Sequence, residues 1–160
     1  MPKRKRRKRE REKLIDWVST IEHWDWGYSL SVADRKYHHE PYYEFQHLKA
    51  NASLMYPRGL NPDAVSIWIL SSIDMNRENR ANDKSIGVGS LHLNSTLLQC
   101  WLTIPDEALS DIVRMFTAGR IRYLQWSAPS LYFGKALIKR FSFRMNLDYD
   151  EIIVEDYWAA

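Results

Sequence analysis

Residues 24–32 read WDWGYSLSV, and this stretch constrains the fold more than any other part of the chain. Its large apolar side chains fall on every second residue and alternate with Asp25, Gly27, Ser29 and Ser31. A period of two is that of a strand with one buried face, because successive side chains of a strand point to opposite faces of its sheet. The chain is therefore expected to build a half-buried sheet.

Several later segments also have strand character. Residues 64–73, AVSIWILSSI, are apolar on both faces, which predicts a central strand. A change of phase near His47 within residues 43–54 predicts a β-bulge or a bend. Further strands are expected at residues 86–93, 95–104, 120–126, 134–147 and the C-terminal tail, and the last long segment should turn Leu137, Phe141, Phe143, Met145 and Leu147 inward. The polar residues 76–85 between them are expected to form an exposed hairpin loop.

Two segments have helical spacing. Pro105 suits the first position of a helix, Gly119 suits the residue after its end, and the apolar face between them predicts a helix over about 105–118. Within residues 9–22, four apolar side chains fall at i, i+3, i+4 and i+7, which predicts an amphipathic helix at the N-terminus; they are Leu14, Trp17, Val18 and Ile21.

Short strand spacing without βαβ alternation indicates a mainly β protein, either an antiparallel sandwich or a strongly bent sheet, with one packed helix. An α+β open sheet is the alternative. We expect residues 14–160 to form one globular domain and residues 1–13 to form a separate basic arm.

Positive charge is concentrated in that arm. The chain has 23 Lys+Arg and 20 Asp+Glu; residues 1–13 contain nine of the former and two of the latter, which leaves 14 and 18 for the rest. A net positive arm on a slightly acidic body is typical of chains that bind polyanions, since each basic group that neutralises a phosphate releases a counterion. The arm's predicted phosphate-binding residues are Lys3, Arg4, Lys5, Arg6, Arg7, Lys8, Arg9, Arg11 and Lys13.

A second basic group lies in the two strands near the C-terminus. Arg120 and Arg122 are two residues apart, and Arg140 and Arg144 are four apart, so each pair is expected to share a strand face. Lys135, Lys139 and several aromatic residues lie nearby in the sequence, Tyr132 and Phe133 among them. Basic groups interleaved with aromatic rings suit single-stranded nucleic acid, although an ordinary outward sheet face has the same pattern.

The leading hypothesis is a non-enzymatic module that binds nucleic acid. The alternative is an interaction or assembly subunit whose arm and first helix, through Leu14, Trp17, Val18 and Ile21, dock on an acidic partner or on a second copy to form a homodimer.

The sequence offers little evidence for metal binding or catalysis. His38, His39 and His47 with Glu40 and Glu44 contain metal-ligating groups, but adjacent His residues and a strand spacing of three do not converge easily on one ion. The acidic cluster of Asp148, Asp150, Glu151, Glu155 and Asp156 lacks the ligand spacing of a calcium loop. No nucleophile or phosphate-loop motif is present, so we expect neither an enzyme nor a cofactor; a metal-dependent activity around His38, His39 and His47 is the remaining alternative.

The single cysteine, Cys100, permits no intrachain disulfide, and it lies in an apolar run that should keep its thiol unreactive. No apolar run reaches the roughly 20 residues of a membrane span, and no signal-peptide pattern precedes the body. We therefore expect an intracellular protein without a membrane partner, cytoplasmic or, in a eukaryotic cell, nuclear.

Overall fold

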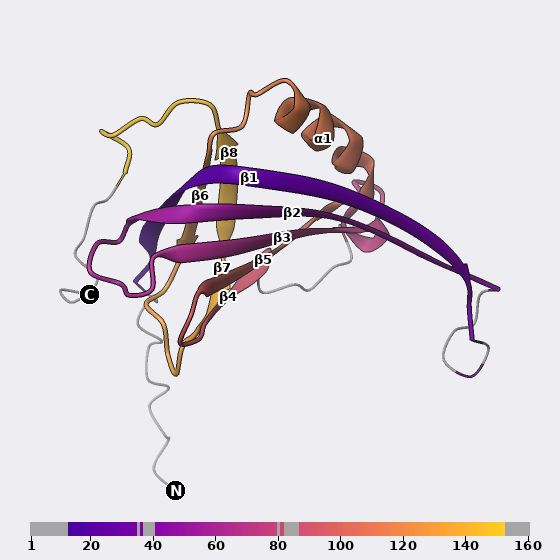
Figure 1. The fold of residues 1–160 in the computed structure, drawn as a ribbon, viewed down its shortest axis with the longest axis horizontal. Coiled ribbons are helices and arrows are strands. Elements are labelled where there is room, and N and C mark those ends of the chain that lie inside the picture. The colour runs from indigo at the N-terminus through magenta and orange to yellow at the C-terminus, as the bar shows by residue number, and fades with distance from the viewer. Residues whose placement is uncertain (1–12, 35, 37–40, 80, 82–86, 153–160) are drawn as a thin grey trace, which may run out of the picture.

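A computed structural model describes residues 13–34, 36, 41–79, 81 and 87–152. Its main feature is one eight-stranded sheet with the strand order β7-β4-β5-β3-β2-β1-β6-β8 (Figure 1). The predicted mainly β class is confirmed. The sheet bends strongly on itself, and no second sheet stacks on it among the described residues, so the bent-sheet alternative fits better than the sandwich.

The first three strands form an antiparallel meander. β1 (Ile15–Val32) pairs with β2 (Tyr42–Tyr56), and β2 pairs with β3 (Ala64–Ser72). The register is continuous across His47, so the bulge predicted there is wrong. The irregularities lie instead between Val18 and Ser19 and between Ile21 and His23. The second of these inserts an extra residue into β1, which moves the inward side chains from odd to even positions.

A parallel pair lies in the middle of the sheet. β4 (Gly89–Leu93) and β5 (Leu98–Pro105) form a hairpin, but β5, not β4, lies beside β3 and runs parallel to it. The connection around residues 76–85 is therefore a crossover to the far side of β5, and its prediction as a hairpin loop is wrong. β3 is central, as its two apolar faces predicted.

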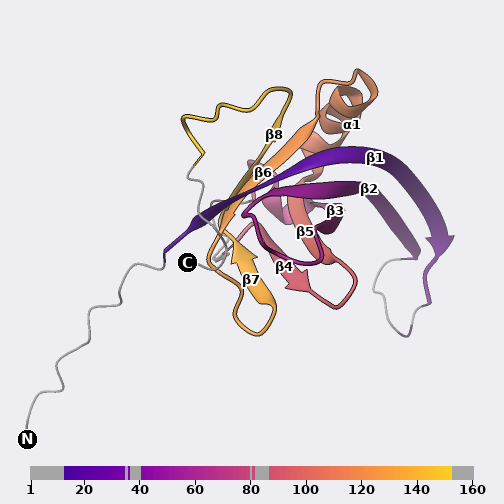
Figure 2. The ribbon, with the colours of Figure 1, turned by 60° about the vertical axis from the view of Figure 1, so that its left-hand side comes forward.

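One bent segment brings the two ends of the sheet together. β7 (Lys135–Ile138) pairs with β4 at one end, and β8 (Arg140–Arg144) pairs with β6 (Tyr123–Ala128) at the other. Only Lys139 separates β7 from β8, and its N–H donates to the Ser127 carbonyl over 2.9 Å. The sheet is consequently a nearly closed barrel, which Figure 2 shows from the side.

The bend at Lys139 also changes the phase of the inward side chains. Ala136 and Ile138 face inward on β7, whereas Phe141 and Phe143 do so on β8. The predicted inward position of Leu137 is wrong, since its side chain is 39% exposed. Met145 is also exposed, beyond the end of β8.

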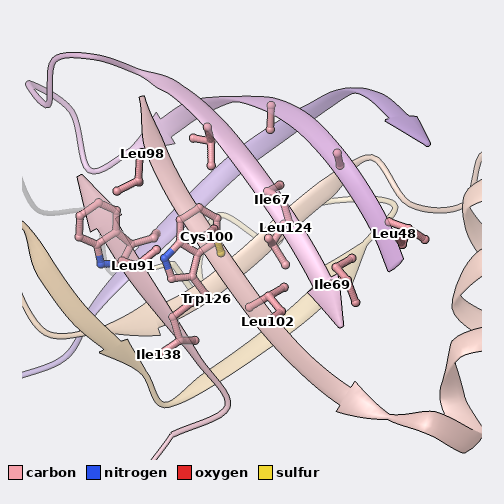
Figure 3. Close-up of a cluster of buried hydrophobic side chains, with 14 of the residues drawn as sticks. Leu48, Ile67, Ile69, Leu91, Leu98, Cys100, Leu102, Leu124, Trp126 and Ile138 are labelled. Carbon is pink, nitrogen blue, oxygen red and sulfur yellow. The ribbon is translucent and has the colours of Figure 1, made fainter. Parts of the chain in front are cut away.

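The barrel interior is filled by buried apolar side chains from seven of the strands, and the partly buried Phe141 and Phe143 of β8 pack against them (Figure 3). Trp17 on β1 and Trp126 on β6 stack with ring centroids 6.2 Å apart, and both are fully buried. Cys100 lies opposite Ile67 and Leu91 on neighbouring strands, and burial raises the pKa of its thiol well above the usual range.

The predicted helix is confirmed, with a later start. A 3₁₀ turn at Asp106–Ala108 precedes α1 (Leu109–Thr117), and Gly119 follows its end with φ +66°. Leu109 and Phe116 are buried against the barrel, where Phe116 contacts the rings of Trp24 on β1 and Phe143 on β8. Figure 1 shows α1 beside β1, away from the start of that strand.

The predicted N-terminal helix is wrong over residues 15–22, which belong to β1; residues 9–12 lie outside the described part of the chain. Ile15, Trp17 and Ser19 face the interior, while Asp16 and Val18 face outward and are nevertheless buried. A strand that is buried on both faces loses its period of two, so apolar residues at positions 14, 17, 18 and 21 resembled a helical stripe.

Candidate functional site

The connection between β6 and β7 contains an unusual tight turn. Tyr132 and Lys135 exchange two backbone hydrogen bonds, from the Tyr132 N–H over 2.9 Å and from the Lys135 N–H over 3.1 Å. The two residues between them, Phe133 and Gly134, have φ of +49° and +72°. Two positive φ values are the pattern of a type I′ turn, which favours Asn or Gly and disfavours a bulky side chain such as Phe at its first central position.

This turn is fixed to the end of β4. The Leu93 N–H donates to the Gly134 carbonyl over 2.7 Å. A Cβ at position 134 would lie 3.0 Å from the Leu93 carbonyl oxygen, so glycine is needed there both for the close approach and for the backbone conformation.

The turn holds two aromatic rings away from the barrel. Tyr132 is 77% exposed and Phe133 is 86% exposed, and their ring centroids are 4.5 Å apart in an edge-to-face arrangement. Exposed apolar side chains that lie next to one another can mark a contact surface.

A groove of about 670 Å³ lies beside the two rings. His92 on β4 is the register partner of Lys135 on β7, and both line the groove together with Leu137 and Lys139. The site therefore combines stackable rings, an apolar surface and cationic groups. This combination suits a ligand with flat rings and negative charge.

The basic arm joins the body near this groove. Ile15, the first residue of β1, pairs with Ala128, the last residue of β6. The next two residues, Pro129 and Ser130, line the groove. Figures 1 and 2 show the start of β1 and the β6–β7 connection at the same end of the barrel. Of the predicted arm residues, Lys13 is described and exposed, and the others lie outside the described residues.

The four predicted sheet arginines come together only in part. Arg120 and Arg122 precede β6 rather than lying on it, although the Arg122 N–H donates to the Arg144 carbonyl over 2.9 Å. Arg140 and Arg144 lie on β8 and line a cleft of about 400 Å³. Among the described residues, the lining of this cleft includes neither Arg120 nor Arg122.

Carboxylates lie close to the two arginines of this cleft. The Arg140 guanidinium lies 3.4 Å from Asp16 Oδ1, and that of Arg144 lies 3.7 Å from Glu151 Oε2. The local charge is thus partly compensated, which makes this cleft a weaker anion site than the groove beside Phe133. Glu151 is the member of the predicted acidic cluster that contacts Arg144, while Glu155 and Asp156 lie outside the described residues.

The four residues predicted to dock on a partner do not form a free surface. Trp17 and Val18 are fully buried, Ile21 packs against the core, and Leu14 is 38% exposed. A partner could reach the two buried side chains only if the barrel opened.

The predicted metal ligands do not converge where they are described. Glu44 and His47 lie on opposite faces of β2, as the spacing of three indicated. The His47 ring packs over Gly27 and lies between the rings of Phe45 and Trp68, with centroids 5.3 and 5.4 Å away. Within the described part of the chain no three His, Cys, Asp or Glu residues gather as a metal site would require; His38, His39 and Glu40 lie outside it.

Sequence reasoning missed two residues of the groove. His92 has no local signal for this position, and Leu137 is predicted to face inward because nothing in the sequence marks the bend at Lys139. The Phe133–Gly134 pair was the available signal, since glycine between two strand segments marks a turn.

No family model, curated protein or solved structure matches this chain. Among the described residues, no helix combines the length and the apolar character needed to cross a membrane.

Proposed function

We propose that this protein is a non-enzymatic module that binds single-stranded nucleic acid in the groove beside Tyr132 and Phe133. The observation that carries the proposal is the exposure of these two rings on a turn whose backbone disfavours Phe. Bases would stack on the rings, and Lys135 and Lys139 would contact the flanking phosphates.

The basic arm adds a second set of phosphate contacts. Its nine Lys and Arg residues begin the chain, and the arm joins the body beside the groove. Contacts to phosphate supply affinity without sequence preference, and base stacking is tolerant of sequence as well. The proposed module is therefore a general binder of single strands with strong salt dependence.

Fluorescence anisotropy with labelled single-stranded and double-stranded oligonucleotides tests this function. We expect the full chain to prefer single strands, and Phe133→Ala to weaken binding by roughly 5- to 150-fold, the range for losing one base stack. Tyr149→Ala is the matched control, because Tyr149 is 59% exposed in the turn after β8 and does not line the groove.

The arm is tested in the same assay with Arg6→Glu combined with Arg7→Glu. Affinity should fall alike for all sequences, and the dependence of affinity on salt should become shallower. Binding that is unchanged in this variant would remove the arm from the proposal. Equal affinities of the Phe133→Ala and Tyr149→Ala variants would remove the groove.

A further inference from the structure

The outer half of the β1–β2 hairpin extends past β3 as a two-stranded ribbon (Figure 1). Its pairing runs from Tyr28 opposite Gln46 to Val32 opposite Tyr42. β6 pairs with β1 only as far as Thr20. From His23 to Val32, the second edge of β1 has no strand beside it among the described residues. An isolated two-stranded ribbon of this length is marginally stable in water.

Two hydrogen bonds show which residues of β1 direct their backbone N–H and C=O groups toward the open edge of the strand. The Ala33 N–H donates toward β2, to the Pro41 carbonyl over 3.0 Å. The Trp26 N–H instead donates to the side chain of its neighbour Asp25 over 2.9 Å. Because backbone direction alternates along a strand, the even-numbered residues direct their N–H and C=O groups to the open edge. These residues are Trp24, Trp26, Tyr28, Leu30 and Val32.

The same five residues also carry an apolar face, which is exposed except where the Trp24 ring contacts Phe116 on α1. Register partners share a face, so their side chains continue the inward face of Leu48 and Ala50 beyond the barrel. Their exposed fractions rise from 39% at Trp24 through 51% at Tyr28 to 81% at Val32. A long apolar edge of this kind is a template for pairing with another strand.

We propose that this edge pairs with the same edge of a second copy of the chain, antiparallel and centred on Tyr28. The two-fold axis then places Tyr28 opposite Tyr28 of the second copy, Trp26 opposite Leu30, and Trp24 opposite Val32. Apolar residues meet apolar residues at each of these positions, so the strand is complementary to itself.

Charge favours the same register. Asp25 is the one charged residue between Trp24 and Val32, and the axis at Tyr28 places it opposite Ser31 of the second copy. An axis at Asp25 would instead bring two carboxylates together, which is unfavourable. The stretch contains neither Lys nor Pro, the residues that usually block edge pairing.

Nine paired residues on each copy supply about ten backbone hydrogen bonds, close to the number in a typical stable interface. The Trp26 N–H leaves Asp25 to make one of them. The two ribbons become one four-stranded sheet, and each copy loses the open edge of β1.

Sedimentation equilibrium of the full chain tests the pairing. We expect a molar mass of twice 19.0 kDa that returns to 19.0 kDa in Leu30→Lys, because a charged residue at the edge blocks pairing. Leu30 is 58% exposed, so the variant should keep the fold, which circular dichroism checks. A monomeric wild type, or a dimer that persists in folded Leu30→Lys, would overturn the proposal.

Cysteine cross-linking tests the register of the pairing independently of the Leu30→Lys variant. Tyr28→Cys should form a disulfide-linked dimer under mild oxidation, since the axis brings the two positions together. Leu30→Cys is the control, because position 30 faces position 26 of the second copy. Cys100 is fully buried and contributes no competing thiol. A Tyr28→Cys protein that cross-links no faster than Leu30→Cys would also overturn the proposal.

Discussion

The indole rings of Trp17 and Trp126 stack at 6.2 Å with an angle of 11° between their planes. They are register partners on β1 and β6, strands that lie far apart in the sequence, and neither has any exposed surface. This stack lies where the first strand meets the late strands, so it links the two halves of the barrel.

Replacing Trp126 with Ala should therefore lower the free energy of unfolding by about 3–5 kcal/mol, the usual loss when a large buried aromatic side chain leaves a cavity. Urea denaturation followed by circular dichroism measures this change. Tyr149→Ala, at an exposed position, should stay within about 0.5 kcal/mol of the wild type. Similar losses in both variants would show that the stack does not hold the barrel together.

A second prediction concerns a polar network on the outward side of the same strands. Ser127 Oγ donates to Asp16 Oδ1 over 2.6 Å and accepts from Arg140 Nε over 2.7 Å. Asp16 and Ser127 are buried, so Ser127→Ala removes a donor from a buried carboxylate at a cost of roughly 1–3 kcal/mol. Ser142→Ala on β8 is the control. A double-mutant cycle of Ser127→Ala with Arg140→Ala should give non-additive changes, and strict additivity would contradict the network.

The buried thiol of Cys100 predicts a loss of stability at alkaline pH. Burial raises the pKa of this thiol in the folded protein, so unfolding releases its proton above the pKa of the unfolded chain, about 8.5. Stability therefore falls with rising pH, and this residue accounts for a loss of roughly 2 kcal/mol by about pH 10. Comparing the pH dependence of urea denaturation in the wild type and in Cys100→Ala isolates the contribution. Parallel curves for the two proteins would contradict it.

Much of the fold could be predicted from local pattern. The alternation in residues 24–32, the doubly apolar strand at residues 64–73 and the helix before Gly119 each have a signal within their own sequence. The register between distant strands has none. Trp17 and Val18 are buried on opposite faces of β1, which pairs with β6. Three of the four apolar residues that suggested a helix, Trp17, Val18 and Ile21, therefore belong to the barrel.

The candidate site could also be predicted from the sequence only in part. The basic arm and the residues Tyr132 and Phe133 are evident in the sequence, whereas their neighbourhood depends on two pairings. The pairing of Ile15 with Ala128 places the root of the arm beside the groove, and the pairing of His92 with Lys135 forms one of its walls. The charge of Arg140 and Arg144 suggested a basic strip, but the nearby carboxylates of Asp16 and Glu151 became apparent only in three dimensions.

The turn at Phe133 predicts a conflict between stability and binding. Asn tolerates a positive φ far better than Phe, so Phe133→Asn should relieve backbone strain and raise the free energy of unfolding by about 0.5–1 kcal/mol. The same change removes an exposed ring and should weaken binding of single strands as much as Phe133→Ala does. Thermal unfolding and fluorescence anisotropy on one preparation measure both effects.

Two further variants separate the effect of backbone strain on stability from the effect of the Phe133 ring on binding. Gly134→Ala should destabilise the turn, since φ is +72° there and the added Cβ would crowd the Leu93 carbonyl. Phe133→Tyr keeps both the ring and the strain, so it should retain binding and gain no stability. If Phe133→Asn were more stable and bound as well as the wild type, the exposed ring would have no part in binding. A less stable Phe133→Asn would mean that the turn does not strain its Phe, and the unusual backbone would then say nothing about function.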